Sequence, residues 1–108
     1  MSSFPIVDLP AFLPFEAGKR TTQALVDLPG ATKLVLAALD GGAEVAPHAV
    51  PYPAGVLLLS GTLEVQLDTA WHPVVPGQFF PIPAGIRHAV RAQEPSHFLV
   101  LHARGLTA

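Results

Sequence analysis

Proline and glycine occur so often along this chain of 108 residues that long helices are disfavoured. The sequence contains twelve prolines and nine glycines, and no stretch of a dozen residues both lacks them and shows helical spacing. A proline in a helix interior costs about 3 kcal/mol, because it removes a backbone hydrogen bond and clashes with the preceding turn. Short strands joined by turns are therefore the regular structure that this sequence favours.

Short runs rich in aliphatic and β-branched residues lie between these breaks. Turn signals separate the runs about every 8–12 residues, a spacing typical of a β-sandwich or barrel. Apolar and polar residues alternate in Leu63–Leu67, whereas residues 34–39 are apolar on both faces, as in a strand that is covered on both sides. We predict strands at residues 23–28, 32–39, 56–59, 62–67, 71–75, 79–82, 87–92 and 97–103.

Charge and hydropathy exclude several classes of partner. Six basic residues against eight acidic ones give a net charge of -2, and the basic residues are scattered, whereas a nucleic-acid-binding protein needs a clustered basic face. No apolar run approaches the roughly 20 residues of a membrane span. Residues 1–5 do not resemble a secretory signal, and the absence of cysteine fits a reducing compartment. We therefore expect a cytoplasmic protein without nucleic-acid or membrane partners.

The length suits one domain over residues 1–108, in which residues 1–20 form an extended N-terminal arm. The arm carries the large apolar side chains of Phe4, Leu9, Phe12 and Phe15, which we expect to pack on the barrel or on a partner. Only 13% of the residues are charged and 50% are hydrophobic. A chain with so few charges is expected to hide apolar surface against a second copy, so we predict a homodimer.

Two segments resemble the two signature motifs of the cupin superfamily. The first segment keeps the opening glycine, the first histidine and the closing glycine of its motif, and the second keeps both glycines, the proline and the histidine. The resemblance spans residues 42–92 and implies an all-β fold, a double-stranded β-helix or jelly-roll barrel. The residues in register are Gly42, His48, Gly61, Gly77, Pro83, Gly85 and His88.

The resemblance also implies where metal ligands would lie. In cupins that bind metal, two histidines and a glutamate of the first motif converge with a histidine of the second. Here His48 and His88 keep two of these positions, whereas Val50 and Ala54 stand at the positions of the other histidine and the glutamate. Imidazole and carboxylate ligands suit a divalent transition metal, but catalytic sites normally have three protein ligands. The resemblance thus implies that a metal is bound weakly or not at all.

Two further side chains are candidate ligands beside water or a bound small molecule. His97 and His102 differ by five positions on one predicted strand, so they face opposite sides and at most one faces inward. Glu44 shares a side with His48 if the strand there is regular. We therefore name His102 and Glu44 as possible additional ligands, the alternative for each being a surface or hydrogen-bonded side chain.

A closed barrel of this size leaves room for one small ligand. Valine and alanine in place of histidine and glutamate make the interior apolar, and Arg87 or Tyr52 at the mouth would suit a small, partly apolar ligand, including an anionic one. Strand alternation predicts the following pocket residues: Val50, Ala54, Val56, Leu58, Phe80 and Val90.

Three functions remain open at this point. The first is a small-molecule-binding barrel with a degenerate two-histidine site, which Val50 and Ala54 support. The second is a metal-dependent enzyme of dioxygenase or isomerase type, completed by water or by non-family ligands, which His48 and His88 support. The third is an interaction module in which the barrel serves as a dimerisation scaffold. We favour the first.

Overall fold

The computed structural model describes residues 6–67 and 69–105, so Phe4 of the predicted arm lies outside the described residues. Within this part of the chain no helix is long and apolar enough to cross a lipid bilayer. The predicted strands recur with ends shifted by a few residues, and the structure adds one strand, β3. The elements are α1 (Leu9–Phe12), β1 (Arg20–Asp27), β2 (Thr32–Leu39), β3 (Glu44–His48), β4 (Ala54–Ser60), β5 (Leu63–Leu67), β6 (Ala70–Val74), β7 (Phe79–Ile82), β8 (His88–Ala92) and β9 (Ser96–Ala103).

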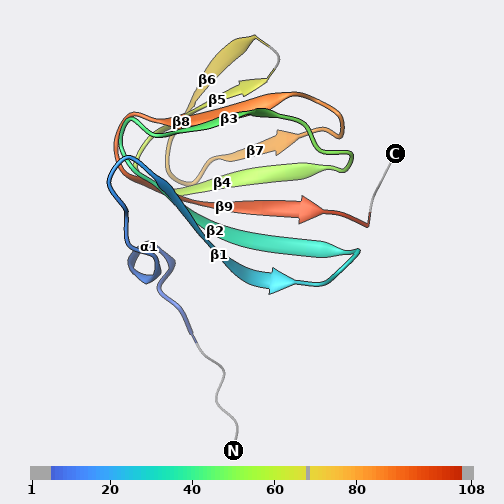
Figure 1. The fold of residues 1–108 in the computed structure, drawn as a ribbon, viewed down its shortest axis with the longest axis horizontal. Helices are drawn as coiled ribbons and strands as arrows, with labels where there is room; N and C mark the ends of the chain where they lie inside the picture. Colours follow the sequence, from blue (N-terminus) through green and yellow to red (C-terminus); the bar gives the residue numbers. More distant parts are fainter. Residues whose placement is uncertain (1–5, 68, 106–108) are drawn as a thin grey trace, which may run out of the picture.

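The strands form two antiparallel sheets that face each other (Figure 1). The five-stranded sheet has the order β1-β2-β9-β4-β7, and the four-stranded sheet has the order β3-β8-β5-β6. Most neighbours in space are distant in sequence: β2 and β4 flank β9, and β3 and β5 flank β8. The chain therefore winds back and forth between the sheets. The predicted all-β jelly-roll barrel is confirmed.

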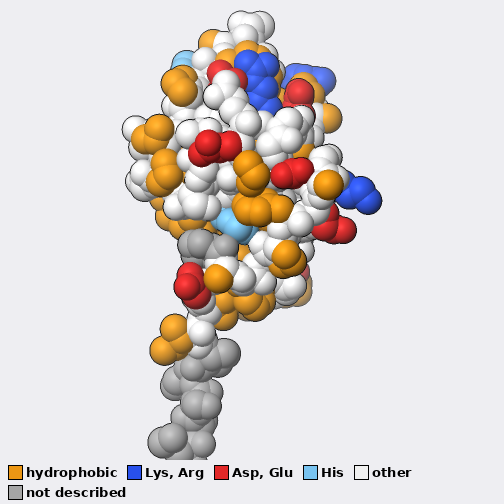
Figure 2. Space-filling model, turned by 90° about the vertical axis from the view of Figure 1, so that its left-hand side faces the viewer, with side chains coloured by type: hydrophobic (Ala, Val, Ile, Leu, Met, Phe, Trp, Pro, Cys, Tyr) orange, Lys and Arg blue, Asp and Glu red, His pale blue; other side chains and the backbone are white. Residues whose placement is uncertain are grey.

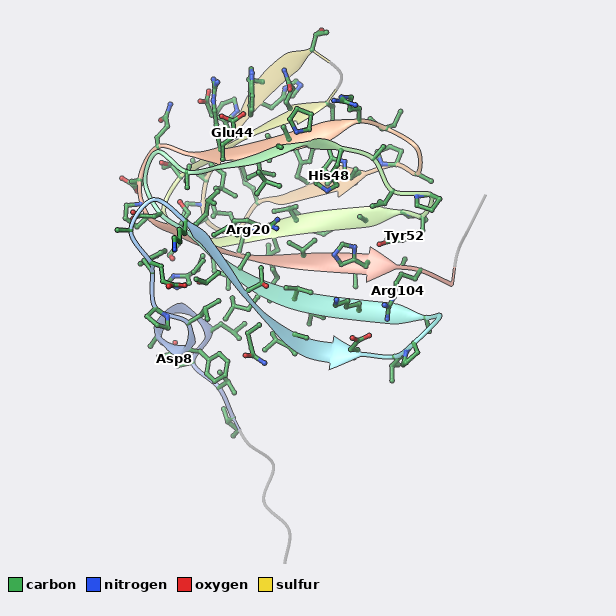
Figure 3. All side chains as sticks on the ribbon, viewed as in Figure 1. Asp8, Arg20, Glu44, His48, Tyr52 and Arg104 are labelled. Atoms are coloured by element: carbon green, nitrogen blue, oxygen red, sulfur yellow. The ribbon has the colours of Figure 1, made fainter. Side chains whose placement is uncertain are left out.

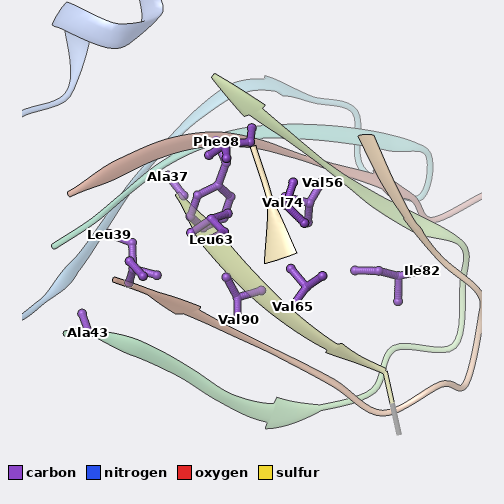
Figure 4. Close-up of a cluster of buried hydrophobic side chains, with 12 residues drawn as sticks. Ala37, Leu39, Ala43, Val56, Leu63, Val65, Val74, Ile82, Val90 and Phe98 are labelled. Carbon is purple, nitrogen blue, oxygen red and sulfur yellow. The ribbon is translucent and has the colours of Figure 1, made fainter. Parts of the chain in front are cut away.

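A cluster of aliphatic side chains joins the two sheets (Figure 4). Strand alternation places these side chains on the inner faces, as in β5, where Leu63 and Val65 are buried and the residue between them is less so. Burying one such side chain stabilises a fold by about 1.5–3 kcal/mol, far more than a surface ion pair. The cluster consists of Ala37, Leu39, Ala43, Val56, Leu58, Leu63, Val65, Val74, Ile82, Val90, Ala92 and Phe98.

A buried histidine fastens the N-terminal arm to the barrel. The Nε2–H group of His97 donates a hydrogen bond to the carbonyl oxygen of Leu13 at 2.7 Å, and its Nδ1 lies 3.2 Å from Ser60 Oγ. The rings of Phe15 and His97 are 4.3 Å apart between centroids. The arm is not extended throughout, because α1 forms one helical turn within it. His97 is thus a structural histidine that faces away from the barrel interior.

The polarity of the outer surface differs from one part of the barrel to another. On the end of the barrel that Figure 2 shows, acidic side chains are scattered among hydrophobic ones. The outer face of the five-stranded sheet is more apolar: Phe79 and Leu101 are exposed there, and they border a shallow groove. The side chains that line this groove carry no charge; they belong to Leu34, Leu57, Phe79, Leu99 and Leu101, around Gly55.

The turn between β4 and β5 allows no side chain at Gly61. Its φ angle is +87°, and a Cβ atom would overlap Ser96 Oγ and the carbonyl oxygen of Pro95. Ser96 has no freedom to move aside, because it is fully buried and its hydroxyl group bonds to both backbone groups of Thr62. Two separate constraints therefore require glycine at this position.

We predict that Gly61→Ala lowers the free energy of unfolding by about 2–5 kcal/mol, since left-handed strain and steric overlap add together. Gly77→Ala is the matched control: Gly77 has a φ of +89° but no atom within 4 Å of a Cβ, so we expect a loss of only about 1–2 kcal/mol. Urea unfolding measures both. Equal losses would show that the contact with Ser96 does not constrain the turn.

Candidate functional site

His48 on β3, labelled in Figure 3, lies beside His88 on the adjacent strand β8. The register between β3 and β8 pairs the two residues directly. Their ring centroids are 4.1 Å apart, with the ring planes tilted by 58°. His88 is buried, whereas His48 is exposed at the open side of the cavity that both residues line. The structure thus brings together the two histidines that the sequence singled out.

A β-bulge in β3 produces this arrangement. The pairing is regular at Val45 and Val90 and then shifts before His48 and His88. The inward residues of β8 are two positions apart, but those of β3, Val45 and His48, are three apart, so β3 contains one extra residue. Without the bulge, Glu44 would share a side with His48. With it, Glu44 is exposed and outside the cavity lining, and the expectation of a common side is wrong.

The two imidazoles are anchored by the same local hydrogen bond. His48 Nδ1 lies 3.0 Å from the carbonyl oxygen of Ala46, and His88 Nδ1 lies 3.1 Å from that of Ile86. A carbonyl oxygen only accepts hydrogen bonds, so Nδ1 carries the proton in both rings and a neutral ring keeps its lone pair on Nε2. Within the described residues neither Nε2 atom has a hydrogen-bond partner. Each ring is therefore held with a potential ligand atom unused.

The environment keeps His88 neutral. Burial lowers the pKa of His88 below its ordinary value, because the charged imidazolium loses solvation. The hydrogen bond to the Ile86 carbonyl raises the pKa in part, and the neighbouring His48 lowers it again. At neutral pH His88 thus keeps the lone pair that metal binding or hydrogen-bond acceptance requires.

A third histidine, His102 on β9, faces the same cavity. Tyr52 places its hydroxyl oxygen 3.2 Å from His102 Nδ1, and the two rings meet edge to face at 5.7 Å. Burial lowers the pKa of His102, and the positive charges of Lys33 and Arg104 lower it further. Of the two histidines on β9, it is His102 that lines the cavity and His97 that holds the arm.

The three histidines border a cavity of about 220 Å³ between the sheets. Its wall is largely aliphatic, formed by Val35, Ala37, Val45, Val50, Ala54, Val56, Ile82, Val90, Phe98 and Val100. Its polar side chains are those of Arg20, Thr22, Lys33, His48, His88 and His102.

Four of the six predicted pocket residues line this cavity, namely Val50, Ala54, Val56 and Val90. Leu58 does not, because it lies one step further along β4, opposite Phe98 in the packed core. Phe80 packs against the core from the edge strand β7, and its ring lies 6.2 Å from that of the exposed His72 on β6. Arg87 is exposed and outside the lining, so it is not the cation of the cavity.

The cations that do line the cavity, Arg20 and Lys33, were missed in the sequence. Arg20 lies outside the predicted first strand, because the prediction began at residue 23 and β1 begins at Arg20. Lys33 alternates with Val35 and Ala37 on the inner face of β2, but residues 34–39 are apolar on both faces, so the sequence did not show which face is inward. The pairing of Lys33 with His102, which lies 69 residues later in the sequence, shows which face of β2 is inward.

The donor set does not match the four-ligand site that the family resemblance implies. Among residues 6–67 and 69–105, no group of three or more His, Asp or Glu side chains is arranged to hold a metal ion. His102 lines the cavity without converging with the other two histidines on one point, and Glu44 lies outside. Two imidazoles fall short of the three protein ligands of a typical catalytic metal site.

Comparisons with known proteins agree with this geometry. Residues 35–102 match the family described as Cupin domain. A conserved protein of unknown function from Streptococcus pyogenes is 29% identical, with a TM-score of 0.86 over 95% of this chain and 90% of that one. KdgF from Halomonas sp. is 26% identical, with a TM-score of 0.78 over 94% of each chain.

The likeness of fold extends to more distant sequences. A cupin superfamily protein from Desulfitobacterium hafniense is 17% identical, and it superimposes with a TM-score of 0.84 over 95% of this chain and 93% of its own. A comparison with functionally curated proteins found no match.

Proposed function

We propose that this chain, which belongs to the cupin superfamily, binds a small molecule in the cavity beside His48 and His88. The observation that carries the proposal is the cavity itself, about 220 Å³ of space with an aliphatic wall and a few polar groups. Ligand pockets have this composition, because apolar walls supply affinity and a few polar groups fix orientation. A cavity of about 150 Å³ admits benzene, so the expected ligand is somewhat larger than one ring.

The side chains at Val50 and Ala54 favour binding over metal chemistry. Both line the cavity that contains the histidine pair, at the positions where the family resemblance implies a second histidine and a glutamate. Valine and alanine coordinate no metal, and their small size leaves the space open. The barrel is retained while half of the implied ligand set is replaced by apolar wall.

Filling the cavity tests this function. Ala54 pairs with His102 on one side and Ile82 on the other, so Ala54→Phe directs a ring into the cavity. We expect fragments that give saturation-transfer signals with the wild type to lose them with Ala54→Phe, while the fold remains intact. Val75→Phe, at an exposed position outside the cavity, is the control and keeps the signals. Fragments that bind Ala54→Phe as well as they bind the wild type would refute binding in this cavity.

A metal-dependent enzyme of dioxygenase or isomerase type is the second candidate. The observation in its favour is the pair of backbone-anchored imidazoles with free Nε2 atoms, since proteins orient ligating histidines in this way. Water or a bound small molecule would have to complete the coordination of a divalent transition metal. The missing third protein ligand makes this the weaker proposal.

Restoring the family ligands distinguishes the two candidates. We expect Val50→His with Ala54→Glu to tighten Zn²⁺ or Mn²⁺ binding at least about tenfold, because it rebuilds a four-ligand cage. As a control, His48→Ala and His88→Ala are added to this variant, and we expect them to abolish the gain in metal affinity. Calorimetric titration of protein without a histidine tag measures both. Tight stoichiometric metal binding by the wild type would favour the enzyme; no gain in the double variant would show that the positions do not converge.

We also propose that the apolar outer face of the five-stranded sheet pairs with a second copy of the chain. A two-fold interface must be self-complementary, and the groove on this face, whose lining side chains carry no charge, meets that condition. Sedimentation velocity at micromolar concentration should show a dimer that Leu101→Glu converts to a monomer. Val75→Glu, on another surface, should leave the dimer intact. A monomeric wild type would refute the pairing.

A further inference from the structure

We propose that the ligand of this cavity is a small carboxylate, with its anionic group beside Lys33 and its apolar body against the valines. The inference rests on the small-molecule function proposed above and adds the chemical class of the ligand. It is carried by the placement of charge on the cavity wall, which differs from the charge of the protein as a whole.

The cavity has positive side chains and no negative ones. Arg20 and Lys33 line it from β1 and β2, and none of the described lining residues is Asp or Glu, although the whole chain has a net charge of -2. Within the described part of the chain, neither cation has a carboxylate oxygen within 4.0 Å. Lys33 is half-buried on this largely aliphatic wall, whereas Arg20 is exposed. Lys33 therefore loses part of its solvation without gaining a partner, and an anionic ligand would compensate for that loss.

The acidic residue opposite Lys33 is already paired with another cation. Asp27 stands opposite Lys33 in the β1–β2 register, but its Oδ1 atom accepts a hydrogen bond of 2.6 Å from Arg104 Nη2. This bond, with the added charges of Arg104 and Lys33, lowers the pKa of Asp27. The charges of Asp27 and Arg104 cancel, and Asp27 lies outside the cavity lining. The positive charge of Lys33 therefore remains available to a ligand.

The strand register separates a polar row from an apolar row. Across β2, β9 and β4, Lys33 aligns with His102 and Ala54. Two residues further along β2, the next inward row consists of Val35, Val100 and Val56. Inward rows of a sheet lie about 7 Å apart, so the wall matches a ligand with a charged head about 7 Å from the far end of its apolar body. An aromatic monocarboxylate has these dimensions.

Arg20 on β1 is the second cation that lines the cavity. Arg20 pairs with Leu39, six residues along β2 from Lys33, and it reaches the cavity by its long side chain (Figure 3). Its planar guanidinium group favours a carboxylate, which it can bind through two parallel hydrogen bonds. Because Lys33 lies in the polar row and Arg20 does not, we expect Lys33 to contribute more to affinity.

Three probes of similar size test the class of ligand, namely benzoate, benzyl alcohol and phenyl phosphate, titrated into the full chain and followed by two-dimensional NMR. We expect benzoate to bind most tightly. Lys33→Gln should weaken benzoate binding at least about tenfold, as expected for a charged hydrogen bond, and leave benzyl alcohol unchanged. Arg20→Gln should have a smaller effect. Lys19→Gln, which removes an exposed lysine outside the lining, should have none.

The possible failures are separable. Equal affinity for benzoate and benzyl alcohol, or equal effects of Lys33→Gln and Lys19→Gln, would overturn the carboxylate inference while leaving the binding function intact. Tighter binding of phenyl phosphate would replace carboxylate by phosphate. If no probe perturbs the resonances of cavity residues, or if Ala54→Phe binds every probe as the wild type does, both the inference and the binding function fail.

Discussion

The shift of register between β3 and β8 is the constraint on which the site depends. One extra residue between Val45 and His48 turns both side chains into the barrel, and it sets His48 against His88 with ring centroids 4.1 Å apart. The same residue sends Glu44 outward, so its carboxylate is lost from the interior. Bulges often lie beside functional sites because they redirect a side chain without changing the fold. Here the bulge decides which donors β3 contributes to the interior.

The interior is shared between a packed part and an open part. Large side chains such as Leu39, Leu58 and Leu63 fill the packed part, whereas the small side chain of Ala54 leaves space near the histidines. Several residues belong to both the core and the cavity wall, so site and stability are coupled there: Ala37, Val56, Ile82, Val90 and Phe98. Burial acts on the chemistry as well, because it lowers the pKa values of His88 and His102, which share the cavity with Arg20 and Lys33.

Most of the fold could be predicted from the sequence, but only part of the site. Proline and glycine spacing indicated short strands, and the motif register brought His48 and His88 to one place. The sequence concealed β3, since Pro47 interrupts its alternation and the bulge depends on the partner strand. It also concealed Lys33, whose strand is apolar on both faces and gains an inside only by pairing with β9. Properties set by pairing between distant strands were therefore the ones that local patterns missed.

The protonation of the two imidazoles tests most directly whether this histidine pair presents unused donor atoms to a ligand cavity. Long-range ¹H–¹⁵N correlation spectra of the wild-type protein at slightly alkaline pH report which ring nitrogen carries the proton. The hydrogen bonds to the Ala46 and Ile86 carbonyls predict that both His48 and His88 carry it on Nδ1, with Nε2 unprotonated. Protonation of Nε2 in either ring would contradict the geometry, because that ring would then be oriented differently and its lone pair would not face the cavity.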